Sequence, residues 1–241
     1  MQITRGWHAI GVGLYHVSSQ TLVFSDLHLG YEAELHSKGV LVPRRQYKET
    51  IAVLRKIIES AKLVKTIVLN GDLKHSFGRI SSQEWNDILR LIDELRMHCS
   101  QVVVVKGNHD AVIASVLAKK EVIAVDEFRV EDTLVLHGDE LPTAHQIKTT
   151  KIIIIGHDHP AITLRHKSTS HKYKCYLRGA YTRRTLIVQP STFPLVVGSD
   201  VAKEQLMSPL LPADLRRFEI FVVDEKKLEV LGFGRLGKLK I

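Results

Sequence analysis

The sequence predicts an α/β fold, on the evidence of its short apolar runs and of the amphipathic stretches between them. Five runs rich in β-branched residues have the length and character of buried strands: residues 21–24, 66–69, 102–105, 133–136 and 152–155. Continuous apolar runs of this kind suit sheets that are covered on both faces. Strands that alternate with helices along a chain are typical of the α/β class.

Two longer stretches predict the helices. Residues 47–60 carry apolar side chains at Ile51, Leu54, Ile57 and Ile58, with charged residues between them. This spacing places the apolar side chains on one face of a helix. Residues 85–97 repeat the pattern, and a serine at 81 or 82 stands where a helix N-cap is expected.

The C-terminal third has a different character. Residues 186–188, 195–197, 218–223 and 228–233 have strand character, and no long helical pattern separates them. We therefore expect a second, more antiparallel sheet. Two sheets packed face to face, with helices outside, would bury both sets of strands. Residues 168–174 and 178–184 are polar and basic, so we expect loops or an exposed hairpin there.

Bulk composition bounds the class of protein. We expect a single domain over residues 1–241, although this length fits two small domains as well. The formal charge of +8 favours anionic partners, nucleic acid among them, but a solvated basic surface has the same composition. Cys99 and Cys175 form no C-x-x-C pair, so a thiolate zinc site is not indicated. The absence of a signal-like or membrane-spanning apolar segment leads us to expect a cytoplasmic protein without a membrane partner.

Metal-competent side chains follow all five apolar runs. In chain order they are Asp26 and His28, then Asp72, then Asn108 and His109, then His137, then His157 and His159. Each short motif is common in turns, but five in succession, each after a strand, are improbable by chance. Ligands of α/β sheets bind beyond the carboxyl ends of the strands. In extended chain, residues two apart point the same way, so both members of a doublet could reach one site.

The residue types indicate the kind of ion. Aspartate, asparagine and histidine without cysteine suit ions such as manganese, iron or zinc. The set holds more ligands than one tetrahedral ion needs. Two ions about 3.5–4 Å apart, with one carboxylate as a bridge, would use them all.

The motif series resembles the calcineurin-like metallophosphoesterases over residues 22–160. The motifs concerned are Asp26-x-His28, Gly71-Asp72, Gly107-Asn108-His109-Asp110, His137 and Gly156-His157-x-His159. The tail around residues 189–198 is similar to the archaeal Icc-like, SbcD-related branch. The resemblance implies a four-layer α/β/β/α sandwich of two mixed β-sheets flanked by helices.

The resemblance also implies roles for the site residues. Asp26, His28 and His159 would hold one ion, Asn108, His137 and His157 would hold the other, and Asp72 would bridge them. His109 corresponds to the family's catalytic histidine, which does not bind metal. The family often has an acidic residue three places after the bridging aspartate, which orients that histidine, but here the place holds His75. Another carboxylate, such as Asp110, could take that role, or His109 is held less tightly.

These expectations lead to a functional hypothesis. We predict a dinuclear metal-dependent phosphodiesterase, with nucleases among the candidates, that uses a metal-bridging hydroxide for in-line attack on phosphorus. Manganese is the expected metal, with iron, zinc and nickel as alternatives. A hydrolase of small phosphate esters or cyclic nucleotides, and a non-catalytic metal-site scaffold for a protein partner, stay open. The sequence does not determine the substrate or the oligomeric state, and a dimer is one alternative.

Overall fold

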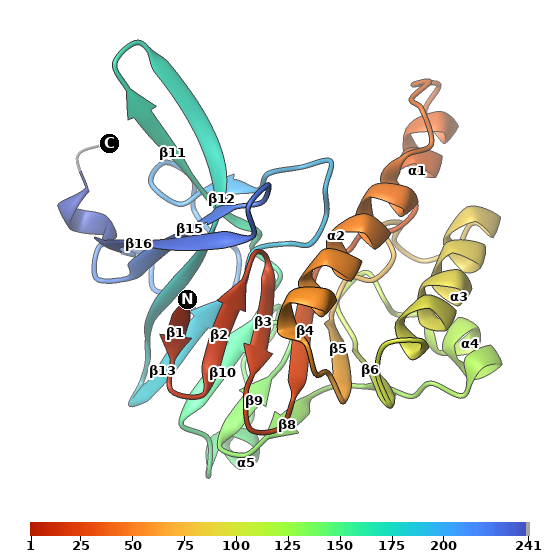
Figure 1. Ribbon diagram of the computed structural model, residues 1–241, viewed down its shortest axis with the longest axis horizontal. Helices are drawn as coiled ribbons and strands as arrows, with labels where there is room; N and C mark the ends of the chain where they lie inside the picture. The colour runs from red at the N-terminus through yellow and green to blue at the C-terminus, as the bar shows by residue number, and fades with distance from the viewer. Residues whose placement is uncertain (240–241) are drawn as a thin grey trace.

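Two mixed β-sheets lie face to face in the structure, a computed structural model that describes residues 1–239 (Figure 1). The first sheet has the strand order β1-β2-β3-β4-β5-β6-β7. Its strands β1 to β4 are antiparallel neighbours, and β4 to β7 run parallel. Their bounds are β1 (Gln2–Thr4), β2 (Trp7–Ile10), β3 (Gly13–His16), β4 (Thr21–Ser25), β5 (Thr66–Asn70), β6 (Gln101–Val105) and β7 (Ala124–Val125).

The second sheet has the order β14-β11-β12-β13-β10-β9-β8, and β15 joins it through β12 and carries β16. Strands β9, β10 and β13 run parallel, and most other pairs are antiparallel. The bounds are β8 (Phe128–Val130), β9 (Thr133–Val135), β10 (Ile152–Ile155), β11 (Pro160–His166), β12 (Thr169–Tyr181), β13 (Arg184–Val188), β14 (Ser199–Asp200), β15 (Glu219–Asp224) and β16 (Glu229–Arg235). The β11–β12 hairpin projects from the body of the protein (Figure 1).

Strand β10 shows how the layers are filled. Ile152 and Ile154 belong to the core shared with the first sheet, whereas Ile153 and Ile155 belong to a second core on the outer face. Side chains alternate between the faces of a strand, so a run of four isoleucines can serve two apolar layers at once. The continuous apolar run in the sequence thus reflects a strand that is buried on both faces.

Helices flank the two sheets. The described helices are α1 (Tyr31–Ser37), α2 (Gln46–Ala61), α3 (Ser82–Arg96), α4 (Ala114–Leu117) and α5 (Ala144–Ile147), with short 3₁₀ turns η1 (Ala118–Lys120) and η2 (Leu236–Lys238). Helices α2 and α3 pack on the outer face of the first sheet (Figure 1). Helix α3 begins with a capping box at Ser81 and Glu84, in which each side chain accepts a hydrogen bond from the other residue's backbone N–H. On the second sheet, short α5 and the irregular segment 201–215 supply the cover.

The predicted α/β/β/α sandwich is confirmed, and the predicted strands and helices that carry the site agree with the structure to within a few residues. The strand expected at 195–197 is wrong, because that segment is exposed and irregular after a turn at 194–195. The preceding backbone crosses the end of β4, where the N–H groups of Thr192 and Phe193 donate to Ser25 and Asp26, and Pro194 has no N–H for a ladder. No helix within residues 1–239 combines the length and apolarity that a bilayer crossing requires.

Candidate metal centre

The eight predicted site residues meet where the two sheets bring the carboxyl ends of five strands together. Strands β4, β5 and β6 are parallel neighbours in the first sheet, and β9 and β10 are parallel neighbours in the second. The face-to-face packing of the sheets places the loops after these strands against one another. The set is therefore assembled from strands of two sheets.

Backbone conformation, rather than extended chain, aims the doublets into the site. Asp26, His28, Asp72, His157 and His159 have φ values of 54°, 48°, 47°, 67° and 45°. Such left-handed conformations are uncommon outside glycine and tend to cluster at functional sites. The expectation of extended doublets is therefore wrong for the backbone, although both members of each doublet do face the site. Backbone hydrogen bonds hold the turn after β4, including that from the His28 N–H to the Asp72 carbonyl oxygen at 2.9 Å.

Two glycines let the carboxylates sit close to neighbouring backbone. A Cβ atom at Gly156 would lie 2.5 Å from Oδ2 of Asp26, and one at Gly107 would lie 2.3 Å from Oδ1 of Asp72. Neither separation is tolerable for a carbon and an oxygen. The glycines in Gly-Asn-His-Asp and Gly-His-x-His thus have a steric reason, which is the room needed by the two aspartates.

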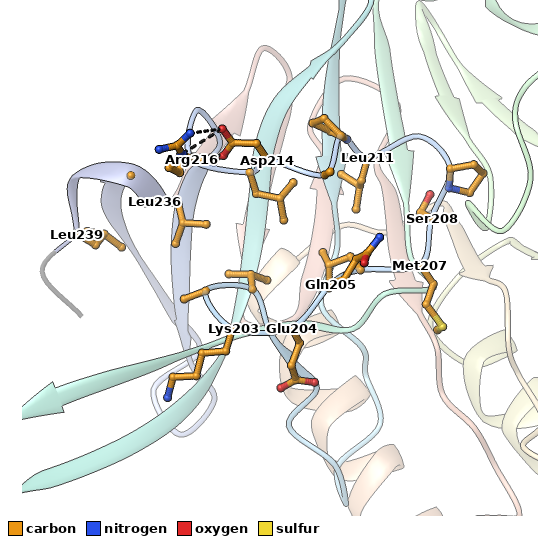
Figure 2. A pocket seen from close by; sticks show the side chains of 18 residues that line it. Lys203, Glu204, Gln205, Met207, Ser208, Leu211, Asp214, Arg216, Leu236 and Leu239 are labelled. Atoms are coloured by element: carbon orange, nitrogen blue, oxygen red, sulfur yellow. Dashed lines mark hydrogen bonds and ion pairs between the residues drawn. The ribbon is translucent and has the colours of Figure 1, made fainter.

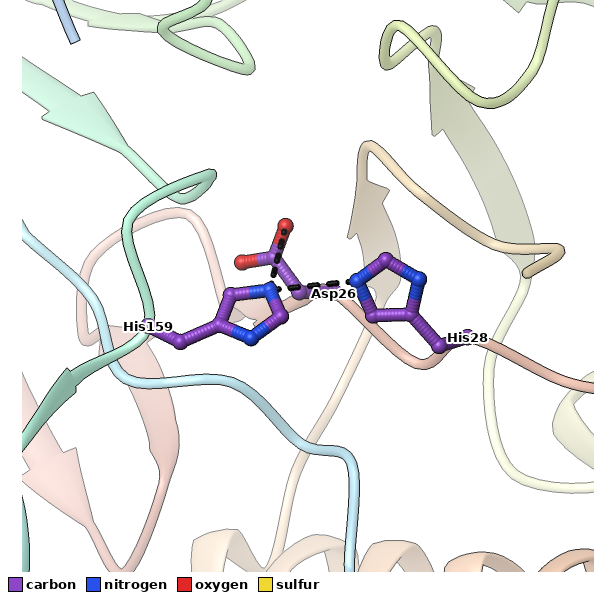
Figure 3. A group of neighbouring side chains, drawn as sticks. All are labelled: Asp26, His28 and His159. Carbon is purple, nitrogen blue, oxygen red and sulfur yellow. Dashed lines mark hydrogen bonds and ion pairs between the residues drawn. The ribbon is translucent and has the colours of Figure 1, made fainter. Parts of the chain in front are cut away.

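The first cluster of side chains consists of Asp26, His28 and His159 (Figure 3). Nε2 of His28 lies 3.1 Å from Nε2 of His159, and the latter atom lies 3.6 Å from Oδ1 of Asp26. Asp26 is fully buried, and its carboxylate accepts the N–H of His157 at 3.1 Å. Potential ligand atoms of three residues thus point at one common volume.

The second cluster consists of Asp72, His137 and His157, with Asn108 beside them. Nε2 of His137 lies 3.1 Å from Nδ1 of His157, 3.0 Å from Oδ1 of Asn108 and 3.5 Å from Oδ1 of Asp72. The other carboxylate oxygen of Asp72 faces His28, at 3.7 Å from Nε2. Asp72 therefore lies between the two clusters and offers one oxygen to each.

His109 stands beside this centre. Its Nε2 lies 3.7 Å from Oδ2 of Asp72, so distance alone does not separate it from the surrounding potential ligands. Its backbone N–H donates to Oδ1 of Asp72 at 3.0 Å. Its ring Nδ1 contacts the backbone carbonyl oxygen of His75. No carboxylate is needed to orient the ring, because this carbonyl accepts the Nδ1–H proton.

Asp110 does not orient His109 and instead braces the loop after β5. Its buried carboxylate accepts the N–H groups of Leu73, Lys74 and Gly107 at 3.1–3.3 Å. Burial, aided by the charge of Asp72, raises the pKa of Asp110 to about 6. The suggestion that Asp110 replaces the family's orienting carboxylate is therefore wrong, since its oxygens are occupied by backbone donors.

The electrostatics of the centre favour a bound cation. Burial lowers the pKa of His28 to about 3, and neighbouring His159 adds to this effect. Burial also acts to lower the pKa of His137, but the hydrogen bond with Asp72 and the charge of Asp26 outweigh it and raise the pKa to about 9. Burial acts to raise the pKa of Asp72, yet His137 holds it well below its usual range. The carboxylates thus stabilise positive charge at the position of His137.

The donor set fits divalent cations. In each cluster two imidazole nitrogens face each other at 3.1 Å. Two such lone pairs cannot satisfy one another unless a proton or a cation lies between them. The surrounding donors are carboxylate and amide oxygens, which are ligands that manganese, iron and zinc accept.

A family model for the calcineurin-like phosphoesterases matches residues 19–201. The chain belongs to that family. Calcineurin-like phosphoesterases are metal-dependent hydrolases of phosphate esters, and the clustered aspartates and histidines are the candidate metal ligands. No curated protein matches the sequence significantly.

One solved structure shows the same fold, and a second is more distantly similar. A nuclease MPE from Pseudomonas putida aligns over 94% of this chain and 100% of its own, with a TM-score of 0.63 and 16% identity. Zinc-bound Vps29 from Entamoeba histolytica aligns over 85% of this chain and 86% of its own, with a TM-score of 0.36 and 14% identity. The TM-score of the nuclease shows that it shares the fold of this chain.

Several residues of this calcineurin-like site were not expected from the sequence. Phe77, which is 67% exposed, packs on the ring of His109 with the two ring planes tilted by 33° and the centroids 3.7 Å apart. Buried Phe193 lies beside His28 and meets the ring of Tyr31 edge to face. Phe77 lies two residues after His75, but Tyr31 and Phe193 come from α1 and from the C-terminal third. Lys74, two residues after Asp72, is buried, and its Nζ donates to the carbonyl oxygen of Ser76.

One cavity borders the centre, and a second is linked to it through Asp158. A cavity of about 430 Å³ is lined by Asn108 and His137 themselves, and also by Lys106 and Thr143. A cavity of about 880 Å³ lies over the segment 201–216 and none of the eight site residues lines it (Figure 2). Hydrogen bonds nevertheless link its wall to the loop that carries two site residues. The N–H groups of Met207 and Ser208 donate to Asp158, which lies between His157 and His159 in the sequence.

Proposed function

We propose that the protein is a dinuclear metal-dependent phosphodiesterase. The observation that carries the proposal is the pair of facing imidazole clusters on either side of Asp72. Each cluster presents ring nitrogens and a carboxylate to one volume, and Asp72 offers a separate oxygen to each. One ion would use only half of this arrangement.

The proposed ligand assignment follows the two clusters. Asp26, His28 and His159 would hold one ion, Asn108, His137 and His157 would hold the other, and Asp72 would contact both. Two divalent ions held there, with manganese as the expected metal, would offset the charge of the phosphate and lower the pKa of water at the site. The protein side chains in this set hold ions and take no part in proton transfer.

His109 is the proposed catalytic residue. Its Nδ1–H donates to the His75 carbonyl oxygen, so Nε2 carries the proton that the ring gains or gives up. That atom faces the centre, and the ring is partly open to solvent, with 14% of the side chain exposed. A protonated His109 can therefore donate from Nε2 to the oxygen that leaves phosphorus.

Space beside the centre supports a diester as substrate. The cavity next to Asn108 and His137 has a volume of about 430 Å³, which is in the range of small-ligand sites. It can receive a second substituent on the phosphate. The formal charge of +8 favours polyanionic diesters, so DNA is the first natural substrate to test.

The test compares two esters and two variants. Metal-stripped protein receives manganese and is assayed with bis-para-nitrophenyl phosphate and with the corresponding monoester. We expect hydrolysis of the diester only. Asp72→Asn should lose affinity for both ions and all activity, whereas His109→Gln should keep both ions and lose about 10²–10⁴-fold in turnover.

Other outcomes would redirect the assignment. Equal, full metal occupancy in both variants would refute the role of Asp72. Preference for the monoester would indicate a hydrolase of small phosphate esters. Full metal occupancy in the wild type without turnover on either ester would contradict an enzyme and favour a scaffold.

A further inference from the structure

His75 occupies the place where the family often has an acidic residue, yet its ring does not contact that of His109 through a hydrogen bond. Nδ1 of His75 instead lies 3.4 Å from Nδ1 of His28. Nε2 of His75 lies 2.9 Å from Oε2 of Glu34 in helix α1. The three side chains form a continuous line from the helix to a proposed metal ligand.

We propose that Glu34 and His75 are positioning residues that fix the tautomer and orientation of the His28 ring for metal binding. The proposal rests on the metal centre of the proposed function. At position 75 the resemblance to the family suggests only that a carboxylate has been lost. The carboxylate is restored from another element, and it acts on a metal ligand instead of on His109.

The acceptor character of Glu34 determines which atom donates in each hydrogen bond along the Glu34–His75–His28 chain. The Glu34 carboxylate can only accept, so neutral His75 must carry its proton on Nε2 to donate to Oε2. Its Nδ1 then has a lone pair and accepts from Nδ1–H of His28. A neutral His28 with its proton on Nδ1 has a bare Nε2, which is the atom that faces His159 and Asp72.

The opposite direction fails on the same grounds. A His75 with its proton on Nδ1 would present a lone pair to the Glu34 carboxylate at 2.9 Å, where two acceptors repel. His28 would then carry its proton on Nε2 and direct it into the site in place of a lone pair. Metal-binding histidines commonly donate their second ring N–H to a nearby acceptor, and loss of that acceptor weakens metal affinity about 10–100-fold.

The surroundings keep the Glu34–His75–His28 chain in place. The other oxygen of Glu34 forms an ion pair with Lys38, the C-cap residue of α1. The N–H of His75 donates to the Leu29 carbonyl oxygen at 2.9 Å, and the His75 ring meets Tyr31 edge to face with centroids 4.8 Å apart. Since the His75 carbonyl also contacts the ring of His109, one residue fixes both a proposed ligand and the proposed catalytic histidine.

Calorimetric titration of manganese into metal-stripped, full-length protein tests the proposal. Glu34→Ala and His75→Ala should weaken one of the two ions about 10–100-fold and leave the other within twofold of wild type. Glu34→Gln should fall between wild type and Glu34→Ala, because its amide oxygen still accepts from Nε2–H. Lys38→Ala removes an exposed side chain whose ion pair with Glu34 contributes little to its position, and should leave both affinities within twofold.

A spectroscopic measurement separates positioning from a purely structural role. In the zinc-loaded wild type, ¹⁵N shifts of the imidazoles should show His75 protonated on Nε2 and His28 protonated on Nδ1. A His75 protonated on Nδ1, or unchanged affinities in Glu34→Ala and His75→Ala, would overturn the proposal. Equal weakening of both ions with a lowered unfolding temperature of the metal-free variants would overturn it as well, since this indicates general loosening. A wild type that binds no ion would overturn the metal centre itself and the positioning role with it.

Discussion

Replacing Gly156 by alanine tests the proposed role of Asp26 without removing a ligand. The new Cβ would lie 2.5 Å from Oδ2 of Asp26 and 2.9 Å from Cβ of Ser25. Ordinary contact begins near 3.4 Å, so the carboxylate oxygen must move by roughly 0.9 Å. Metal–ligand distances tolerate only about 0.2 Å. The backbone of Gly156 lies outside the left-handed region, so the effect of the substitution is steric alone.

We therefore expect Gly156→Ala to lose at least about tenfold in affinity for the ion that Asp26 would hold, by comparison with second-neighbour substitutions at metal sites. The fold should lose about 1–3 kcal/mol from overpacking, which leaves the protein folded at room temperature. Calorimetric titration with manganese gives the affinities, and thermal unfolding of the metal-free protein gives the stability. Gly232→Ala is the matched control, because its nearest neighbour would lie 3.5 Å away.

The metal affinity of Gly156→Ala shows whether this glycine is needed to hold Asp26 in position. A folded Gly156→Ala protein that binds both ions as tightly as wild type would refute the argument that Asp26 is a ligand held in a fixed position. Gly107→Ala extends the test, because its Cβ would lie 2.3 Å from Oδ1 of Asp72 and should weaken both ions.

Three further predictions concern the frame around the centre. Tyr176→Phe removes a buried hydroxyl that lies 3.0 Å from the carbonyl oxygens of both Gly11 and Gly13, and should cost about 1–3 kcal/mol in denaturant unfolding with metal affinity unchanged. Burial lowers the pKa of Lys174 to about 8, so the folded chain binds this proton less tightly than the unfolded chain, and stability is lost as pH falls from about 10.5 to about 8. Unfolding measured at pH 8 and pH 10 should show about 2 kcal/mol of this dependence in wild type, and Lys174→Met should lack it. Asp158→Ala removes the acceptor of the Met207 and Ser208 N–H groups and should speed hydrogen exchange at both amides by about tenfold or more, whereas unchanged exchange would show that Asp158 does not hold the segment.

Local pattern was sufficient for much of the fold. The run at 152–155 is apolar at every position because β10 faces one core with Ile152 and Ile154 and another with Ile153 and Ile155. Helix α3 follows from its apolar spacing and from the capping box at Ser81. The segment 195–197 has the same apolar composition but is not a strand, because its neighbours are hydrogen-bonded to the end of β4. The strand propensity of these residues does not take account of those hydrogen bonds to β4.

The sequence by itself determined the residue types of the centre and their place after five strands. Those features are local, since each motif lies within a few residues of the strand that carries it. Only the tertiary structure decided that the motifs come from two different sheets and that left-handed backbone aims them inward. It also decided that Asp110 serves the backbone while Glu34, from a separate helix, reaches His75. The physical reason is that hydrogen bonds and side-chain contacts depend on how close in space segments far apart in the sequence come to lie. The spacing of residues along the sequence does not determine those distances.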